Sequence, residues 1–216
     1  MNFSEIKAIV FDYDDTIVQT KEIRSITLKR LAKEEYHFTL SDLEIQNAWG
    51  LPGEEFLLKI YGDYAKDVAS LWEKYNNYCS QDKNLPYPGA EEFINGLTDK
   101  YPLGILTSSS QIRVFKEIDL LGFPKDRFFT IQTSDDTSVH KPDPNVFSPL
   151  LEKAKEMGIP REKIIYIGDS LHDQTSSKGA GLEFLGMAHE PSAAEKFSQK
   201  NIPFVTSFRE LGNLFP

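Results

Sequence analysis

The stretch Lys7–Thr16, KAIVFDYDDT, places a short apolar run directly in front of three acidic residues. The run Ala8–Phe11 is far too short to span a membrane and is typical of a buried β-strand. Asp12, Asp14 and Asp15 should therefore lie in the loop at the carboxyl end of this strand. In parallel α/β sheets, ligands bind outside the carboxyl ends of the strands. This acidic loop is the first candidate for a functional site.

The remainder of the chain shows two patterns of apolar spacing. Residues 21–82 carry apolar side chains at helical intervals, with glycines between successive segments. From Pro86 onward apolar runs alternate with helical segments, which implies crossover connections and a mostly parallel sheet covered on both faces. We therefore expect an α/β fold with a Rossmann-like core domain formed by residues 1–20 and 83–216. Residues 21–82 should form an inserted all-helical domain.

Composition and charge exclude several classes of partner. The chain has 216 residues, of which 40% are hydrophobic and 26% charged, as in an ordinary globular protein. The formal net charge of -9 opposes non-specific binding to nucleic acid or to an anionic membrane. Cys79 is the only cysteine, which excludes an intramolecular disulfide and a cysteine-based metal site. With no secretory or transmembrane segment visible, we expect a cytoplasmic monomer or weak homodimer that binds neither nucleic acid nor membrane.

Three further polar clusters follow apolar runs of the predicted sheet. They are Thr107-Ser108-Ser109-Ser110 after LGIL, Lys141-Pro142-Asp143-Pro144 after FFTIQTS, and Gly168-Asp169-Ser170-Leu171-His172-Asp173 after KIIYI. The two prolines stiffen the chain around Lys141 and limit where its ammonium group can point. A pair of acids one residue apart is a weak signal by itself. All four clusters in this order, each at the end of a strand, form a strong one.

The order and spacing of these clusters resemble the haloacid dehalogenase-like hydrolase superfamily. The resemblance is to the branch with a helical cap inserted after the first motif, the branch of phosphoglycolate phosphatase and beta-phosphoglucomutase. It covers the whole chain, because residues 21–82 fall where the cap domain belongs. The resemblance implies a phosphomonoester hydrolase that acts on a small phosphorylated metabolite through an aspartyl-phosphate intermediate.

The same resemblance assigns roles to the acids and to the phosphate-binding residues. Two carboxylates at positions i and i+2 can project into one cavity, where like charges push their pKa values apart. Asp12 is the predicted nucleophile, and Asp14 is the predicted acid and base that serves the leaving group and then the hydrolytic water. The Thr107 hydroxyl and the Ser108 backbone N–H should bind phosphate oxygens. Lys141 should stabilise the charge that develops on the phosphoryl group.

Several carboxylates in one pocket also predict a cation. Such an arrangement is unfavourable without one, and Mg²⁺ is a hard, oxygen-seeking ion that also bridges phosphate. The resemblance implies that Asp12 and Asp169 bind it through their side chains and Asp14 through its backbone carbonyl. Asp173 is expected either as a further ligand or as an acceptor for waters and Lys141. A simple helix cap at Asp173 is the structural alternative.

Two positions depart from the family pattern. Asp15 stands where the family usually has glycine or asparagine, so it should either lower turnover or point to solvent. Thr175–Lys178 replaces small apolar residues, which predicts a more polar helix face. The family's specificity loop corresponds to Gly50, Leu51 and Pro52. Because Gly50–Glu55 contains no Arg or Lys, we expect a substrate with a single phosphate.

Two alternatives remain open. One is a catalytically impaired relative that acts as a regulatory or binding protein, and the other is a sugar-phosphate mutase. The completeness of the motifs favours catalysis, and Thr16 favours hydrolysis because mutases of this branch tend to carry valine there. Asp14 argues against the dehalogenases and the phosphonate-cleaving members, which lack or replace this acid.

Overall fold

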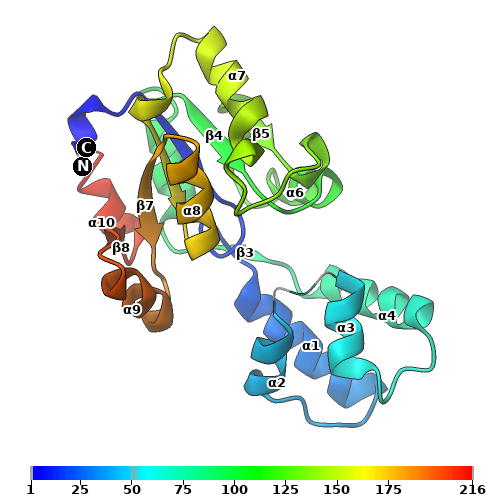
Figure 1. The fold of residues 1–216 in the computed structure, drawn as a ribbon. Helices are drawn as coiled ribbons and strands as arrows, with labels where there is room; N and C mark the ends of the chain where they lie inside the picture. The colour runs from blue at the N-terminus through cyan, green and yellow to red at the C-terminus, as the bar shows by residue number, and fades with distance from the viewer. Residues whose placement is uncertain (1, 50, 52, 216) are drawn as a thin grey trace. The chain divides into compact units, whose positions relative to one another are not determined.

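The computed structural model describes residues 2–49, 51 and 53–215, and its chain divides into two compact units (Figure 1). The first unit contains Met1–Gln19 and Leu85–Pro216, and the second contains Thr20–Asn84. Residues 20, 83 and 84, which the sequence analysis places in the core domain, belong to the second unit.

The first unit is built on a six-stranded sheet in the order β5-β4-β1-β6-β7-β8, in which every neighbouring pair is parallel. The strands are β1 (Ala8–Phe11), β4 (Leu103–Leu106), β5 (Phe128–Gln132), β6 (Ile164–Gly168), β7 (Glu183–Met187) and β8 (Phe204–Val205). The chain leaves β1 toward β4 and β5 and returns to its other side at β6, so the strand order reverses beside β1. Such a reversal opens a crevice at the carboxyl ends of the strands. The predicted α/β fold is confirmed.

The two faces of the sheet bury separate core clusters, because side chains alternate along each strand. In β1, Ile9 and Phe11 belong to one cluster, whereas Ala8 and Val10 belong to the other. Helices α5, α6 and α10 pack on the first face, and α7, α8 and α9 on the second. Their bounds are Ala90–Leu97, Gln111–Glu117, Phe208–Gly212, Ser148–Glu156, Leu171–Gly179 and Pro191–Gln199. With helices on both faces, all of β1 is buried.

The second unit is a bundle of α1 (Lys21–Glu35), α2 (Asp42–Ala48), α3 (Gly53–Tyr61) and α4 (Val68–Gln81) with a core of its own. Ser41 and Glu44 form a reciprocal cap at the start of α2. In the interior, the Tyr61 hydroxyl donates a hydrogen bond to the carbonyl of Leu28 at 2.7 Å. The chain connects this unit to the first through the short antiparallel strands β2 (Val18–Gln19) and β3 (Leu85–Pro86).

Short 3-10 helices complete the first unit. They span Phe3–Glu5, Lys125–Arg127, Ser134–Asp136, Pro144–Phe147 and Arg161–Lys163. Among the helices that the structure describes, none combines the length and the apolar character that a membrane crossing requires.

Candidate active site

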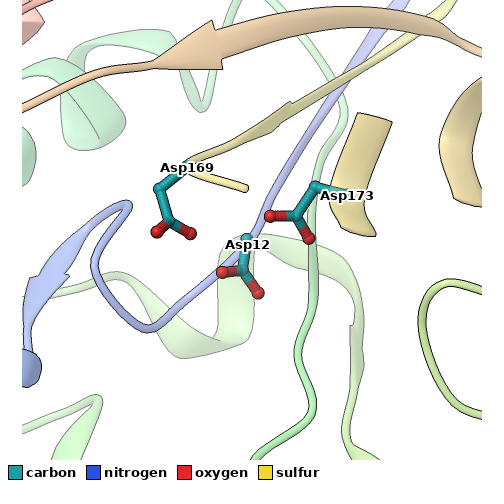
Figure 2. Close-up of side chains that lie close together, drawn as sticks. All are labelled: Asp12, Asp169 and Asp173. Atoms are coloured by element: carbon teal, nitrogen blue, oxygen red, sulfur yellow. The ribbon is translucent and has the colours of Figure 1, made fainter. Parts of the chain in front are cut away.

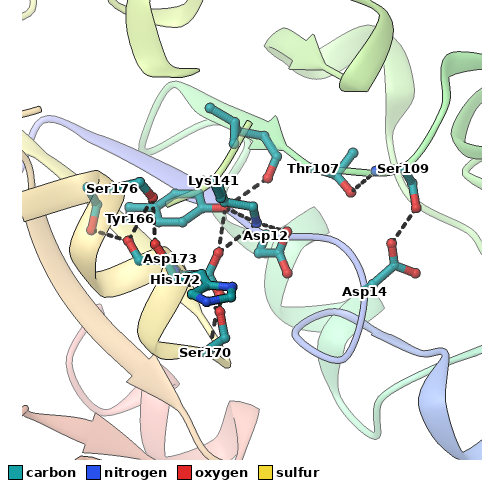
Figure 3. A network of polar contacts seen from close by, with 12 residues as sticks. Asp12, Asp14, Thr107, Ser109, Lys141, Tyr166, Ser170, His172, Asp173 and Ser176 are labelled. Carbon is teal, nitrogen blue, oxygen red and sulfur yellow. Dashed lines mark hydrogen bonds and ion pairs between the residues drawn. The ribbon is translucent and has the colours of Figure 1, made fainter. Parts of the chain in front are cut away.

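Loops at the carboxyl ends of neighbouring strands bring the predicted site residues together (Figure 3). Asp12 directly follows β1, Thr107 follows β4, and Asp169 follows β6. The loop after β5 supplies Lys141, whose ammonium group lies 2.8 Å from Asp12 Oδ1. The backbone N–H of Asp12 still pairs with the carbonyl of Ile167, at 2.8 Å, so the sheet itself holds the first acid in place.

Three carboxylates converge beside β1 (Figure 2). Asp12, Asp169 and Asp173 each offer one oxygen, and these oxygens lie within 4.8 Å of one another. Burial, partly offset by Lys141 and reinforced by Asp173, raises the pKa of Asp12 to about 7. Burial and the charges of Asp173 and Asp12 also raise the pKa of Asp169 well above its ordinary range. The three carboxylates therefore bring more negative charge to the site than the single ammonium group of Lys141 compensates.

The donor set fits a hard divalent cation. Asp169 points its carboxylate toward Asp12 (Figure 2), and within the described residues no side chain donates a hydrogen bond to it. A carboxylate that is half-buried, repelled by its neighbours and without a side-chain donor is a suitable ligand for Mg²⁺, which prefers oxygen. A bound cation would offset the burial of these charges and their mutual repulsion, which together raise both pKa values.

Asp173 caps a helix and binds Lys141 at the same time. Its Oδ1 accepts a hydrogen bond from Lys141 Nζ at 2.6 Å. Its Oδ2 accepts from the backbone N–H of Ser170 at 3.0 Å and from the Ser170 hydroxyl at 2.5 Å, which closes a reciprocal cap on α8. Both oxygens are thus already bound by donors. The structure places Asp173 as an acceptor for Lys141 and as a helix cap.

Lys141 is held by three acceptors. Besides Asp12 and Asp173, its Nζ donates to the hydroxyl of Tyr166 at 3.1 Å. Tyr166 is a fully buried residue of β6, and it donates its own proton to the carbonyl of Leu106 at 2.8 Å. Burial alone would lower the pKa of Lys141, but the two carboxylates raise it well above its ordinary value. The ammonium group therefore stays charged, with all three of its N–H bonds in use.

Sequence reasoning missed Tyr166. It lies in an apolar strand and packs edge-on against Phe147, 4.9 Å between ring centroids, as a core residue would. Nothing in the pattern KIIYI marks its hydroxyl as polar support for the site.

The side chain of Asp14 turns toward the start of α6 (Figure 3). Its Oδ2 accepts a hydrogen bond from the Ser109 hydroxyl at 2.5 Å, and its Oδ1 accepts from Arg113 Nη2 at 2.5 Å. Sequence reasoning missed both partners, because a serine run followed by an arginine is common at the start of a helix.

Thr107 is buried and its hydroxyl accepts the Ser109 backbone N–H at 3.1 Å, whereas Ser108 is exposed.

Asp15 adopts a left-handed backbone conformation, with φ of 56°. Its N–H donates to the carbonyl of Val18 at 2.7 Å and closes a tight turn before β2. Glycine and asparagine suit this conformation best and aspartate tolerates it, which explains the residue types usual at this position. Asp15 is half-buried, and its charge contributes to the raised pKa of Asp169.

Substitutions at Asp15 should separate backbone strain from charge. Asp15→Gly and Asp15→Asn remove the carboxylate but suit the turn, so both should leave kcat/KM within a few-fold and stability unchanged. Asp15→Ala should lower the free energy of unfolding by about 1 kcal/mol, because alanine is strained at positive φ. Steady-state kinetics and urea unfolding of the three variants test this. A hundredfold loss of activity in all three would instead give the carboxylate a role of its own.

Two of the four polar residues Thr175–Lys178 lie on the buried face of α8. Ser176 and Ser177 are fully buried. Their hydroxyls donate back to carbonyls one turn earlier: Ser176 to His172 at 2.8 Å, and Ser177 to Asp173 at 2.7 Å. Each serine satisfies its polar atom within the helix and so replaces a small apolar residue.

The proposed specificity loop lies mostly outside the described residues. Gly50 and Pro52 are not described, and Leu51 is an exposed residue of the second unit. The specificity role of these three residues stays a prediction.

Comparison with known proteins decides the family. A sequence model described as haloacid dehalogenase-like hydrolase matches residues 9–187. The chain belongs to the haloacid dehalogenase-like hydrolases. The predicted family is confirmed, and the match spans all four polar clusters of this hydrolase.

Three individual proteins that resemble this chain share a quarter of its residues or fewer. A Clostridium perfringens protein described as a candidate pyrophosphatase PpaX is 25% identical over 200 residues, which cover 92% of each chain. A solved Thermotoga maritima structure, described as a candidate beta-phosphoglucomutase, superimposes with a TM-score of 0.83 at 18% identity and covers 98% of this chain and 100% of its own. A family hydrolase from Deinococcus radiodurans, solved with bound phosphate and sodium, has a TM-score of 0.78 at 20% identity and covers 96% and 93%. At these identities the solved structures show the shared fold.

Proposed function

We propose that this haloacid dehalogenase-like hydrolase is a Mg²⁺-dependent phosphatase that cleaves a small phosphate monoester through a phosphorylated Asp12. One observation carries the proposal. The buried carboxylate of Asp12 lies 2.8 Å from the ammonium group of Lys141, with a second carboxylate, Asp14, two residues away. That combination offers a nucleophile, a neutralising cation and a proton carrier at the end of one strand.

The proposed reaction has two displacements. Asp12 attacks phosphorus, the bond to the ester oxygen breaks, and Asp14 gives that oxygen a proton so that it leaves as an alcohol. Water then attacks the phosphorus of the aspartyl phosphate, and Asp14 takes a proton from it. The bond to Asp12 breaks, and inorganic phosphate leaves. Asp12 and Asp14 end in their starting forms.

Other residues hold the phosphoryl group and the ion. The Thr107 hydroxyl and the Ser108 backbone N–H supply donors to phosphate oxygens, and the ammonium group of Lys141 supplies a positive charge that stabilises the phosphoryl group. The carboxylates of Asp12 and Asp169 and the carbonyl of Asp14 are the proposed Mg²⁺ ligands, and Asp173 keeps Lys141 in place. When bound, the ion neutralises phosphate charge and orients the phosphoryl group.

Inorganic pyrophosphate is a second candidate substrate, since the curated relatives carry the name pyrophosphatase. The absence of Arg and Lys from Gly50–Glu55 favours a substrate with one phosphate instead. The test is kcat/KM of the purified protein, with and without Mg²⁺, for a panel of monoesters and for pyrophosphate. We expect one monoester to be the best substrate. Pyrophosphate ahead of every monoester would favour the second candidate, and no turnover of any of them would contradict both.

Mg²⁺ should stabilise the wild-type protein against heat even without substrate. A ligand present at a hundred times its dissociation constant stabilises the folded state by about 2.7 kcal/mol. Asp169→Asn should lose most of this increase in Tm, because it removes a proposed ligand. Without Mg²⁺ its Tm should equal or exceed that of the wild type, since a repelled carboxylate is gone. A thermal scan with and without Mg²⁺ measures both effects, and Asp126→Asn, at an exposed position, is the control.

A full Mg²⁺-induced rise in Tm for Asp169→Asn would contradict the assignment of Asp169 as a ligand. It would leave the proposed role of Asp12 untouched, because the scan contains no substrate.

A further inference from the structure

The guanidinium group of Arg113 and the hydroxyl of Ser109 together hold the carboxylate of Asp14. Arg113 Nη2 donates to Asp14 Oδ1 at 2.5 Å, and Nη1 donates to Ser109 Oγ at 2.6 Å. The Ser109 hydroxyl donates in turn to Asp14 Oδ2 at 2.5 Å. Each carboxylate oxygen therefore has a donor, and the two donors are bonded to each other. This closed ring of contacts restricts the rotamers open to Asp14.

A second carboxylate, on the same helix, holds the guanidinium group of Arg113. Its Nε lies 3.4 Å from Oε1 of Glu117, one turn further along α6. The side chains of Arg113 and Glu117 are 25% and 21% exposed, so the pair is partly withdrawn from water. The three nitrogens of the guanidinium group thus face three different acceptors, in a planar fork that a lysine cannot reproduce.

The loop that carries Ser109 is also supported. Asp135 Oδ2 accepts the backbone N–H of Gln111 at 2.8 Å, at the start of α6. The backbone N–H of Ser134 donates to the carbonyl of Ser109 at 3.0 Å. The segment after β5 therefore holds the segment after β4 through two hydrogen bonds. These bonds stabilise the backbone that carries Ser109 and Arg113, the two donors to Asp14.

We infer that Arg113 is a positioning residue for Asp14, with Ser109 as the bridge between them. The inference rests on the proposed function, in which Asp14 must reach first the leaving oxygen and then the attacking water. A carboxylate at the end of a loop samples several rotamers, and only some of them place an oxygen near the phosphoryl group. Arg113 and Ser109 select among these rotamers before substrate binds.

Arg113→Met tests the inference, since it removes every donor and keeps an unbranched side chain. With nitrophenyl phosphate, whose leaving group hardly needs a proton, phosphorylation of Asp12 should proceed within a few-fold of the wild-type rate. The steady-state rate should fall roughly 10- to 100-fold, because a poorly placed Asp14 activates water slowly. Rapid mixing should then show a burst of nitrophenol that precedes slow turnover. Arg113→Lys should restore only part of the lost steady-state rate. Lys116→Met, at an exposed position of the same helix, is the control and should show wild-type kinetics.

A double-mutant cycle separates positioning from a structural role. In an Asp14→Asn background, Arg113→Met should lower the steady-state rate by no more than about twofold, since the group that it positions is already gone. Equal losses in both backgrounds would overturn the inference, as would wild-type kinetics for Arg113→Met. If Arg113→Met does not fold, Ser109→Ala carries the same test, because it removes only the bridging hydroxyl.

The same data distinguish this inference from the proposed function. Turnover that depends on Asp12 in the wild type but is unchanged by Arg113→Met overturns the inference alone. Turnover that survives Asp12→Asn removes the proposed function and this inference with it.

Discussion

Asp12→Asn should lower kcat/KM for every phosphate ester by roughly 10⁴-fold or more, because it removes the nucleophile on which both displacements depend. An amide is isosteric with the carboxylate but cannot form the aspartyl phosphate. The substitution leaves Lys141 with two of its three acceptors, Asp173 and Tyr166, so the site should keep its shape. Steady-state assays with an alkyl and an aryl phosphate measure the loss.

A measurement of Tm shows whether Asp12→Asn loses activity through loss of the nucleophile or through unfolding. Since the pKa of Asp12 is raised to about 7, ionisation of Asp12 costs the metal-free fold stability as pH rises above the ordinary range of an aspartate. Asparagine cannot ionise, so at pH 8 without Mg²⁺ the Tm of Asp12→Asn should equal or exceed that of the wild type. Asp126→Asn, exposed in the 3-10 helix Lys125–Arg127, should change neither activity nor Tm. Residual activity above about a hundredth of wild type would argue against Asp12 as the nucleophile.

Lys141→Met should produce the second-largest effect, a loss of roughly 10²- to 10³-fold in kcat. The ammonium group lies between Asp12 and Asp173 and lowers the pKa of Asp12. Without it, Asp12 would be protonated to a greater extent at neutral pH, and the phosphoryl group would lose a stabilising positive charge. Removal of one partner of a buried ion pair typically costs about 3–5 kcal/mol, so Tm should also fall.

Mg²⁺ should restore part of that lost stability, because a second cation compensates the two carboxylates. Lys155→Met, exposed on α7, is the matched control and should behave as the wild type in both assays. A Lys141→Met enzyme with normal kcat would contradict the account of Lys141, whatever its Tm.

The sheet and the meeting of the four loops could be predicted from the sequence. The run Ala8–Phe11 is too short for an ordinary helix and wholly apolar, so a buried strand can be predicted from its composition alone. In the structure its side chains belong to two core clusters on opposite faces of the sheet. Once the strands are parallel, their carboxyl ends share one edge. Asp12, Thr107 and Asp169 then fall close together without any knowledge of their contacts.

Element ends and supporting contacts could not be predicted in this way. The apolar spacing of residues 110–123 predicts one helix, but α6 ends at Glu117. Gly122 takes a φ of 77°, and Leu120 is 75% exposed. A local turn thus competes with helical periodicity, and the sequence pattern does not say which prevails.

Contacts between segments that are distant in the sequence are even harder to predict. Arg113 and Tyr166 are separated from Asp14 and Lys141 by long stretches of chain, and their residue types are ordinary for a helix and for a strand. Which hydroxyl or guanidinium group meets which carboxylate depends on three-dimensional placement of loops, for which a single sequence carries no period or spacing. For the same reason the sequence does not identify the substrate.

The most direct test of the central claim is detection of a phosphoryl group on Asp12. Asp14→Asn enzyme should be mixed with nitrophenyl phosphate, quenched in acid, digested and analysed by mass spectrometry. Phosphorylation by this ester needs little proton donation, whereas hydrolysis of the aspartyl phosphate lacks its base, so the intermediate should accumulate. We predict that the peptide containing Asp12 gains the mass of one phosphoryl group, and that Asp12→Asn/Asp14→Asn gains none. Phosphorylation of another residue, or release of nitrophenol with Asp12 unmodified at every time point, would contradict the account.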